Sequence, residues 1–356
     1  MRMKNLAVLV SLASMASMVP AHAGVTQTFS SGGKDAAAIQ STVDQFRAVL
    51  GANNGAGSPA ASGRREINWD GVPAQFLDSL PPDFFNKNST RGLVMSTSGS
   101  RLKVSGDQGT ASFRFTDVTD QQWGPNELAP FSAQKLFSPM GSNTTDVTFF
   151  VPGTAQPANV TAFGAVFADV DLADSSWMEL YDPLGKKIAT VAVPVAGVSV
   201  LGLSFAGVVT DEPIARVRIV AGNVSLDARC LTGSSDAAAL DDFIYSEPRA
   251  SSELLLSKGR IRATVEWRSQ YSGQTGTGLA LPQKDEFGYL YFSDPNNPEI
   301  FIKCLDFGSG KAIILVGGVT DFWYKVTFKN SRGETLIWEK PSGSLLGYAN
   351  NSDLSF

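Results

Sequence analysis

Apolar and polar residues alternate along most of the chain with the period of two that is typical of half-buried β-strands. The clearest example is the segment 260–268, where Ile261, Ala263, Val265 and Trp267 share one face, and polar or charged residues share the other. Segments of this kind are short, and Gly, Pro, Asn and Asp separate them. The pattern predicts an all-β protein.

Eight such segments lie between residues 64 and 248, and no helical segment interrupts them. They are Ala111–Val118, Asp146–Val151, Val160–Val170, Trp177–Tyr181, Ile188–Val193, Val198–Val209, Ile214–Val220 and Leu240–Tyr245. Antiparallel sheets that each have one apolar face must pair to bury it. We therefore expect a β-sandwich of jelly-roll type over residues 64–248, with a closed barrel as the alternative.

A second group of strands follows a connection over residues 249–259. Besides 260–268 it contains Phe287–Ser293, Glu299–Leu305, Ala312–Val316, Asp321–Lys329 and Glu334–Glu339. About six strands in roughly 100 residues fit a small β-sandwich of immunoglobulin size. We place this second sandwich at residues 260–356.

One segment has the helical period instead. Four apolar residues recur at helical spacing from Ile39 to Leu50, and Gly51 follows as a stop signal. The stretch 51–63 is rich in Ala, Gly, Ser and Asn and predicts a flexible connection. Residues 24–63 are thus expected to form a leader with a short amphipathic helix. This helix packs on the first sandwich or, alternatively, binds a partner.

Residues 1–23 have the composition of a secretory signal peptide. Basic Arg2 and Lys4 precede an apolar stretch, and Ala21-His22-Ala23 supplies the small residues that a signal peptidase recognises. The apolar stretch is too short to span a bilayer, and no later one approaches the required length of about 20 residues. We expect cleavage after Ala23 and a secreted protein, in the periplasm or at the cell surface, without a transmembrane segment.

The sole histidine, His22, belongs to this signal peptide, so the expected mature chain has none. Ser-His-Asp and Cys-His catalysis need an imidazole, and zinc sites usually use one, so these mechanisms are excluded. The net charge is −5 for the whole chain and becomes about −7 without the signal peptide. A mildly acidic chain without a basic stripe does not favour nucleic acid as a partner.

Cys230 and Cys304 are the only cysteines. In an oxidising compartment an even number of cysteines favours a disulfide. A bridge between these two would join the two sandwiches. Two separately buried thiols are the alternative, because the sequence does not give the distance between the Cα atoms.

Acidic residues gather at the ends of predicted strands in the first sandwich. Asp169 and Asp171 end one strand at alternate positions, Asp241 and Asp242 open the last strand, and Asp70 lies near the start. Hard cations such as Ca²⁺ take about six to eight oxygen ligands. A structural Ca²⁺ site at Asp70, Asp241 and Asp242 is one interpretation, with Asp169 and Asp171 as a second site. Solvated turn carboxylates without a ligand are the other interpretation.

The same carboxylates offer an alternative as the acid and base of a glycoside hydrolase or lyase, which need two groups about 5–10 Å apart. Aromatic side chains offer a site of another kind, because sugar rings stack on flat apolar faces. The alternation places Trp177, Tyr181 and Trp323 on outward faces. They are the predicted ligand-binding residues, unless they cover an interface between the two sandwiches or the helix.

Several segments resemble a group of uncharacterised exported bacterial β-sandwich proteins. These segments are 39–47, 63–73, 141–143, 147–153, 163–171 and 241–245. The resemblance covers most of residues 35–248 and implies a jelly roll similar in outline to carbohydrate-binding and adhesion proteins, without established catalytic residues.

The C-terminal region is similar to a small β module that is appended to many exported bacterial proteins and whose role is unknown. The similar segments are 265–267, 288–292, 297–303 and 305–306. An aromatic residue that is usual in this module is replaced here by Ile313–Leu315.

Together these observations favour an exported, non-catalytic protein that binds a glycan or another cell-surface polymer and is stabilised by calcium. A carboxylate-dependent glycoside hydrolase or lyase on a jelly-roll scaffold is the first alternative. A structural component of the envelope or matrix is the second.

Overall fold

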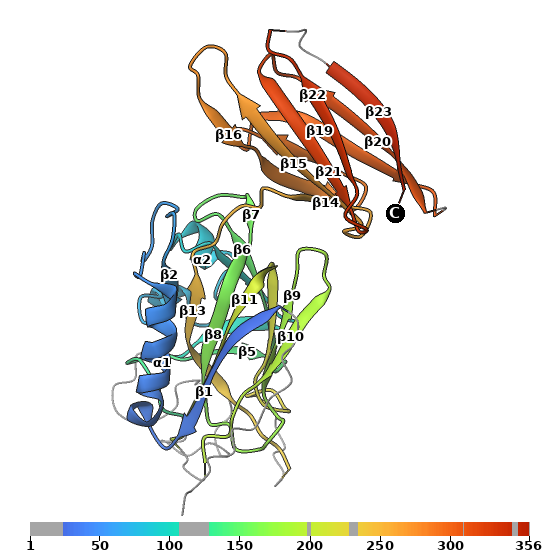
Figure 1. Cartoon of the computed structure of the whole chain (residues 1–356). Coiled ribbons are helices and arrows are strands. Elements are labelled where there is room, and N and C mark those ends of the chain that lie inside the picture. Colours follow the sequence, from blue (N-terminus) through green and yellow to red (C-terminus); the bar gives the residue numbers. More distant parts are fainter. Residues whose placement is uncertain are drawn as a thin grey trace, which may run out of the picture.

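The structure is a computed structural model that describes residues 24–106, 128–197, 201–227, 234–308 and 310–343, and the backbone of 348–355. The predicted signal peptide, the predicted strand Ala111–Val118 and Cys230 lie outside these residues. The described chain is mostly antiparallel β-sheet, which confirms the all-β prediction. Figure 1 shows two groups of strands arranged end to end, which we call the N-terminal half (24–250) and the C-terminal half (251–355).

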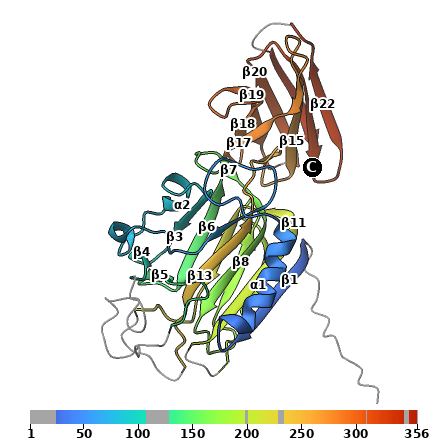
Figure 2. The same cartoon turned by 90° about the vertical axis from the view of Figure 1, so that its left-hand side faces the viewer.

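Two sheets face each other in the N-terminal half (Figure 2). Sheet A has the order β1-β11-β8-β13-β5-β4, with β2 also paired to β13. Its strands are β1 (Val25–Gly33), β2 (Arg64–Ile67), β4 (Arg101–Val104), β5 (Phe137–Met140), β8 (Val160–Ala168), β11 (Leu203–Ile214) and β13 (Ala239–Ser246). Sheet B has the order β10-β9-β12-β6-β3, with β7 paired to β6. Its strands are β3 (Leu93–Ser96), β6 (Thr144–Phe150), β7 (Pro157–Ala158), β9 (Trp177–Tyr181), β10 (Lys187–Ala192) and β12 (Arg216–Val220).

The core of this half forms between the two sheets because their strands alternate as the sequence predicts. Sheet B contributes Val147, Met178 and Val217, all fully buried, and sheet A contributes Phe163 and Phe243. Two short helical turns, η1 (Ala74–Phe76) and α2 (Phe84–Lys87), close one edge of the sandwich.

The helix α1 (Ala36–Leu50) covers the outer face of sheet A, beside β1 and β11 (Figure 2). Asp35 caps its N-terminus by accepting a hydrogen bond from the N–H of Ala38. Phe46 points onto the sheet, where Gly164 and Gly207 lie beneath it. A Cβ atom at Gly164 would come within 2.9 Å of the Phe46 ring. These glycines therefore allow the helix to approach the sheet closely.

The predicted leader, residues 24–63, contributes a strand to the first sandwich as well as the helix that packs on it. Residues Val25–Gly33 form β1, which pairs with β11 and is an integral strand of sheet A. The stretch 51–63 was expected to be a flexible connection, but the Arg65 guanidinium donates hydrogen bonds to the carbonyls of Gly55 and Ser58. The linker is thus fastened to the sandwich. Within the described chain, the helices fall short of the length and apolarity needed to cross a bilayer.

Two further antiparallel sheets make up the C-terminal half. Sheet D has the order β14-β15-β21-β22, with β16 paired to β15, and sheet E has the order β17-β18-β19-β20-β23. The strands of sheet D are β14 (Leu254–Leu256), β15 (Ile261–Arg268), β16 (Thr275–Thr277), β21 (Trp323–Asn330) and β22 (Thr335–Lys340). Those of sheet E are β17 (Leu279–Lys284), β18 (Phe287–Tyr291), β19 (Pro298–Asp306), β20 (Lys311–Gly318) and β23 (Tyr348–Ser355). Strand β14 lies inside the predicted connection 249–259.

Cys304 belongs to the core between these two sheets. It is a free, buried thiol, and burial raises its pKa to about 11. The second cysteine of the possible disulfide, Cys230, lies outside the described residues, so the choice between a disulfide and two separate thiols stays open.

Candidate functional site

Asp241 and Asp242 occupy a β-bulge in β13. The register with β8 places both residues opposite the single residue Val166. β13 pairs with β5 before the bulge and with β2 after it, so the bulge faces a gap between these two strands. A bulge breaks the alternation of a strand and re-aims its side chains. Two consecutive carboxylates can therefore reach the same neighbouring loop.

That loop contains Phe131 and Ser132. Asp241 Oδ2 accepts hydrogen bonds from the N–H groups of Phe131 (2.5 Å) and Ser132 (3.2 Å). Asp242 Oδ1 accepts a hydrogen bond of 2.6 Å from Ser132 Oγ. The Trp69 indole N–H donates to the carbonyl of Asp241 and fixes the bulge from the core side. The two aspartates thus fasten a loop to the sheet.

Helix α1 contacts the same carboxylates from the other side. Arg47 Nη2 lies 3.0 Å from Asp242 Oδ2 and 2.8 Å from Glu66 Oε2. Burial raises the pKa of Asp241 well above its usual range, and the charge of Asp242 raises it further. Burial also raises the pKa of Asp242, against the opposing effects of its Ser132 hydrogen bond and of Arg47. The cluster joins the helix, the sheet and the loop.

Hydrogen-bond donors contact the carboxylate oxygens of the first predicted calcium site. Asp70 Oδ1 accepts hydrogen bonds from the N–H groups of Gln134 and Lys135, and Asp70 Oδ2 accepts one from Asn68. The oxygens of Asp241 and Asp242 likewise face N–H, O–H or guanidinium donors. Among the described residues, no three or more Asp, Glu, His or Cys side chains gather in a way that could hold a metal ion. Asp70, Asp241 and Asp242 do lie around one loop, but they bind its donors.

The second pair, Asp169 and Asp171, lies beyond the end of β8. There the carboxylate of Asp236 accepts hydrogen bonds from the Asp171 N–H (3.4 Å) and from Ser175 Oγ (2.5 Å). Burial raises the pKa of Asp171, and the nearby charge of Asp236 adds to this effect. Asp242, by contrast, is buried beneath its loop. None of the five predicted carboxylates lines either of the two cavities of the described residues that are presented below, so these five do not form an acid and base pair there.

Other side chains cover two of the three predicted aromatic residues. The Arg216 guanidinium lies 3.7 Å from the centre of the Tyr181 ring, and Arg268 lies 5.2 Å from that of Trp323. Trp177 is half-buried on β9, the strand that also carries Tyr181. The predicted positions on outward faces are correct, but the covered rings are poor platforms for a ligand.

The outer face of sheet E carries an aromatic group that the sequence analysis did not assign. Tyr289 and Phe301 make an edge-to-face contact with ring centres 4.8 Å apart, and Phe287 lies 6.1 Å from Tyr289. Phe301 is 41% exposed. Gly317 is the cross-strand partner of Phe301, and a Cβ atom there would meet no atom within 4 Å.

These side chains surround a shallow cavity of about 480 Å³. We call its outward-facing residues the aromatic face: Phe287, Tyr289, Phe301, Lys303, Leu315 and Gly317. The sequence contained one signal for this face. Phe287 and Tyr289 alternate with Gly288 and Leu290, which face the core, so the two aromatic residues should point outward.

Comparisons with known proteins indicate neither a family nor a function for this chain. No family model matches the chain, and neither the search of curated proteins nor that of solved structures found a similar one. The function must therefore be inferred from the side chains themselves.

Proposed function

We propose that this chain is an exported, non-catalytic protein that binds a neutral glycan through the aromatic face of sheet E. One observation carries this proposal: three adjacent aromatic rings remain partly exposed on a regular sheet, around an open depression. Contiguous apolar patches that stay exposed on a folded protein are typical of binding surfaces. Sugar rings have flat C–H faces that stack on aromatic rings, so the chemistry of the face suits them.

The shape of the face supports a flat ligand. Phe287 and Tyr289 lie on β18, Phe301 lies on the neighbouring β19, and hydrogen-bonded pairing fixes their spacing. Gly317 on β20 leaves a step next to Phe301, where a ring can enter. A preorganised surface loses little conformational entropy when a ligand binds.

The charges favour a neutral polymer over an anionic one. The sequence has 34 acidic and 29 basic residues, so the chain as a whole repels polyanions. The aromatic face contains one cation, Lys303, which is too few to compensate for a row of carboxylates or sulfates.

The positions of the carboxylates support a binding role over a hydrolase. Asp241, Asp242 and Asp70 accept hydrogen bonds from a loop, and none of them faces the aromatic face. Self-association into an envelope or matrix component is the remaining alternative, and the binding experiment below tests it.

We further propose that the two halves are separate modules, a jelly-roll-like sandwich followed by a sandwich of immunoglobulin size. The core residues support this division. The clusters of the N-terminal half contain buried residues up to Tyr245, and the third cluster begins at Leu254 and ends at Trp338. The binding face would then belong to the second module alone.

The experiment compares the protein from residue 24 onward with two single variants, F301A and I337A. Ile337 is a matched control because it is 54% exposed on β22, in the opposite sheet. Pull-down and affinity electrophoresis with cellulose, chitin, xylan and starch, and with bacterial surface fractions, should reveal a ligand. F301A should bind it about tenfold more weakly, as expected for the loss of one stacking contact.

Equal binding by F301A and I337A would show that the aromatic face is not the site. Failure of every glycan and surface fraction to bind would contradict the proposal as a whole. Concentration-dependent self-association that F301A abolishes would favour the matrix alternative.

A further inference from the structure

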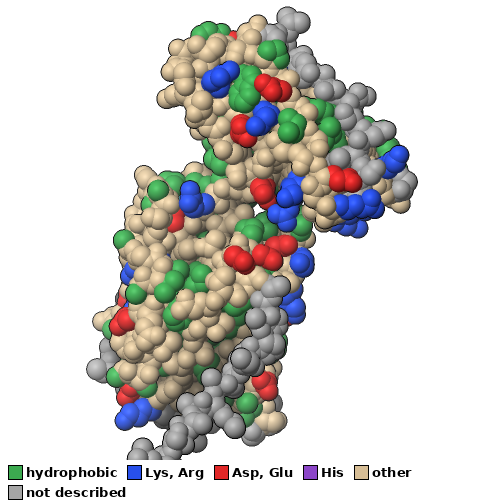
Figure 3. All heavy atoms as spheres, in the orientation of Figure 1, with side chains coloured by type: hydrophobic (Ala, Val, Ile, Leu, Met, Phe, Trp, Pro, Cys, Tyr) green, Lys and Arg blue, Asp and Glu red, His purple; other side chains and the backbone are tan. Residues whose placement is uncertain are grey.

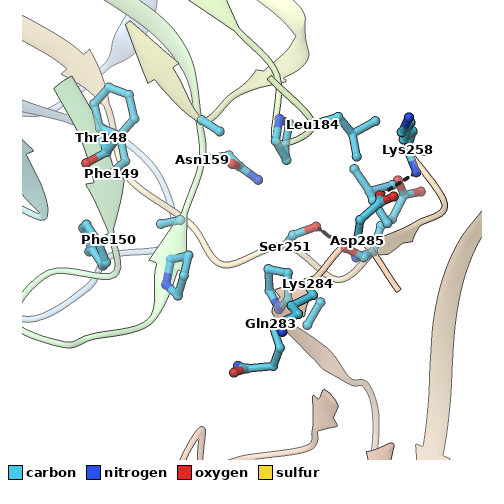
Figure 4. A pocket seen from close by; sticks show the side chains of 18 residues that line it. Thr148, Phe149, Phe150, Asn159, Leu184, Ser251, Lys258, Gln283, Lys284 and Asp285 are labelled. Carbon is cyan, nitrogen blue, oxygen red and sulfur yellow. Dashed lines mark hydrogen bonds between the residues drawn. The ribbon is translucent and has the colours of Figure 1, made fainter. Parts of the chain in front are cut away.

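A second cavity lies where the two halves meet, and it shares no residue with the aromatic face. Its volume is about 630 Å³, within the range of small-molecule sites. Figure 3 shows a waist between the halves, with charged side chains of both signs around it. In Figure 4, Asn159 and Ser251 lie in the middle of this cleft, Phe150 lies on one side, and Lys258 and Asp285 lie on the other.

Direct contacts between the halves hold the walls of the cleft in place. The buried side-chain amide of Gln156 donates a hydrogen bond of 2.9 Å to the carbonyl of Ala280 on β17. Leu184, at the tip of the β9–β10 hairpin, packs on Gly259. A Cβ atom at Gly259 would lie 2.1 Å from Leu184 Cδ1, so a larger residue there would displace the leucine side chain. Contacts between the two halves therefore fix the walls of the cleft.

The carboxylates of the cleft already have partners. Glu253 Oε2 lies 3.0 Å from Arg262 Nη1. Asp285 Oδ1 accepts a hydrogen bond of 2.5 Å from the backbone N–H of Lys258. By contrast, no carboxylate oxygen of the described residues lies within 4.0 Å of the ammonium groups of Lys258 and Lys284, although the charge of Lys258 helps to lower the pKa of Asp306. The cleft thus presents two cations without a direct carboxylate contact.

The remaining walls are largely apolar. Phe150 comes from β6, Leu184 from the hairpin tip, and Leu255 from β14. Pro157 and Pro282 occupy the edge strands β7 and β17, where proline removes a donor that a bound β-strand would need. A small molecule suits this cleft better than an extended peptide does.

We propose that the cleft binds an amphipathic monoanion, with its apolar body against Phe150, Leu184 and Leu255 and its acidic head at the ammonium groups of Lys258 and Lys284. This site is independent of glycan binding. The apolar walls favour a ligand with an apolar body, because binding removes that body from water. The two lysines favour a ligand with a negatively charged head. A long-chain carboxylate has this chemistry.

The test uses two fluorescent probes that share a similar apolar ring system and differ in charge. 8-Anilinonaphthalene-1-sulfonate has a negative charge, and N-phenyl-1-naphthylamine has none. In K258A/K284A the charged probe should bind roughly fivefold to tenfold more weakly, as expected for two exposed ion pairs, while the neutral probe keeps its affinity. The control K311A/K329A removes two exposed lysines elsewhere and should leave both affinities unchanged.

A third variant, S251W, places an indole in the middle of the cleft and should abolish the binding of both probes. Its thermal midpoint shows whether the fold survives. Dodecanoate should displace the charged probe from the unmodified protein, whereas dodecanol should compete poorly. Unchanged binding of the charged probe to K258A/K284A, or of both probes to a folded S251W, would overturn the proposal. Loss of binding in F301A alone would place the probes on the aromatic face and would overturn it too.

Discussion

The two halves of the molecule are both pairs of antiparallel sheets, but they place their polar groups differently. In the N-terminal half Arg65 and Glu247 form an ion pair whose side chains are 0% and 1% exposed. In the C-terminal half, no ion pair within the described residues has both side chains buried. In the pair of Arg262 and Glu253, for example, the side chains are 55% and 42% exposed to solvent.

This difference indicates which half engages its charged side chains in internal contacts. The charges of the N-terminal half hold loops and the helix against the sheets, as Arg65 does for 51–63 and Asp241 for the loop at 131. In the C-terminal half the buried Lys340 ammonium donates to the backbone carbonyls of Phe322 and Pro341, and aromatic rings remain on the outer face of sheet E. Polar side chains that already have internal partners are poor candidates for binding, so the second half offers the better surface.

The largest effect is expected from E247A. Arg65 would remain buried without its partner, and removing one member of a buried ion pair costs about 3–5 kcal/mol. Chemical denaturation monitored by Trp fluorescence measures this loss. The matched change E253A removes the exposed partner of Arg262 and should cost less than about 1 kcal/mol. Similar losses in the two variants would contradict the contrast between the halves.

A smaller, pH-dependent effect is expected from R47M, about 1–3 kcal/mol because Arg47 is only partly buried. Burial already raises the pKa of Asp242, and the loss of Arg47 raises it further. A carboxyl with a raised pKa in the folded state stabilises the fold below its unfolded pKa, and this stabilisation is lost as the pH rises through the folded pKa. Denaturation curves should therefore show a larger loss at pH 8 than at pH 5. An equal or opposite trend would contradict a coupled cluster at the bulge.

The smallest effect is expected from calcium. Since the oxygens of Asp70, Asp241 and Asp242 already accept hydrogen bonds, the thermal midpoint should change by less than about 1 °C between calcium and chelator. Differential scanning calorimetry measures this midpoint. An increase of several degrees in calcium would restore a structural calcium site and require other ligands.

Regular alternation allowed much of the fold to be predicted. The strand predicted at Trp177–Tyr181 has the bounds of β9, and that at Leu240–Tyr245 falls within β13. The strand β1 was missed because most of its residues are Thr, Ser and Gly, which give no apolar alternation. Its partner β11 also lies far away in sequence. Long-range pairing of a polar strand leaves little periodic signal.

The site was predicted less well, for physical reasons. The clustering of Asp241, Asp242 and Asp70 could be foreseen from their positions at strand ends. Their roles depend on a bulge and on N–H groups of a loop, which a sequence does not show. Outward aromatic residues were expected at Tyr181 and Trp323, but cross-strand arginines cover them. The same alternation applied to β18 and β19 would have indicated Tyr289 and Phe301.

Hydrogen–deuterium exchange with a bound glycan tests the binding face most directly. The protein from residue 24 onward is compared with and without the polysaccharide that retains it in the pull-down. We expect slower exchange in β18, β19 and β20, with β9 and β12 of sheet B unchanged. Protection confined to sheet B, or spread evenly over both halves, would contradict the assignment of the aromatic face as the binding site.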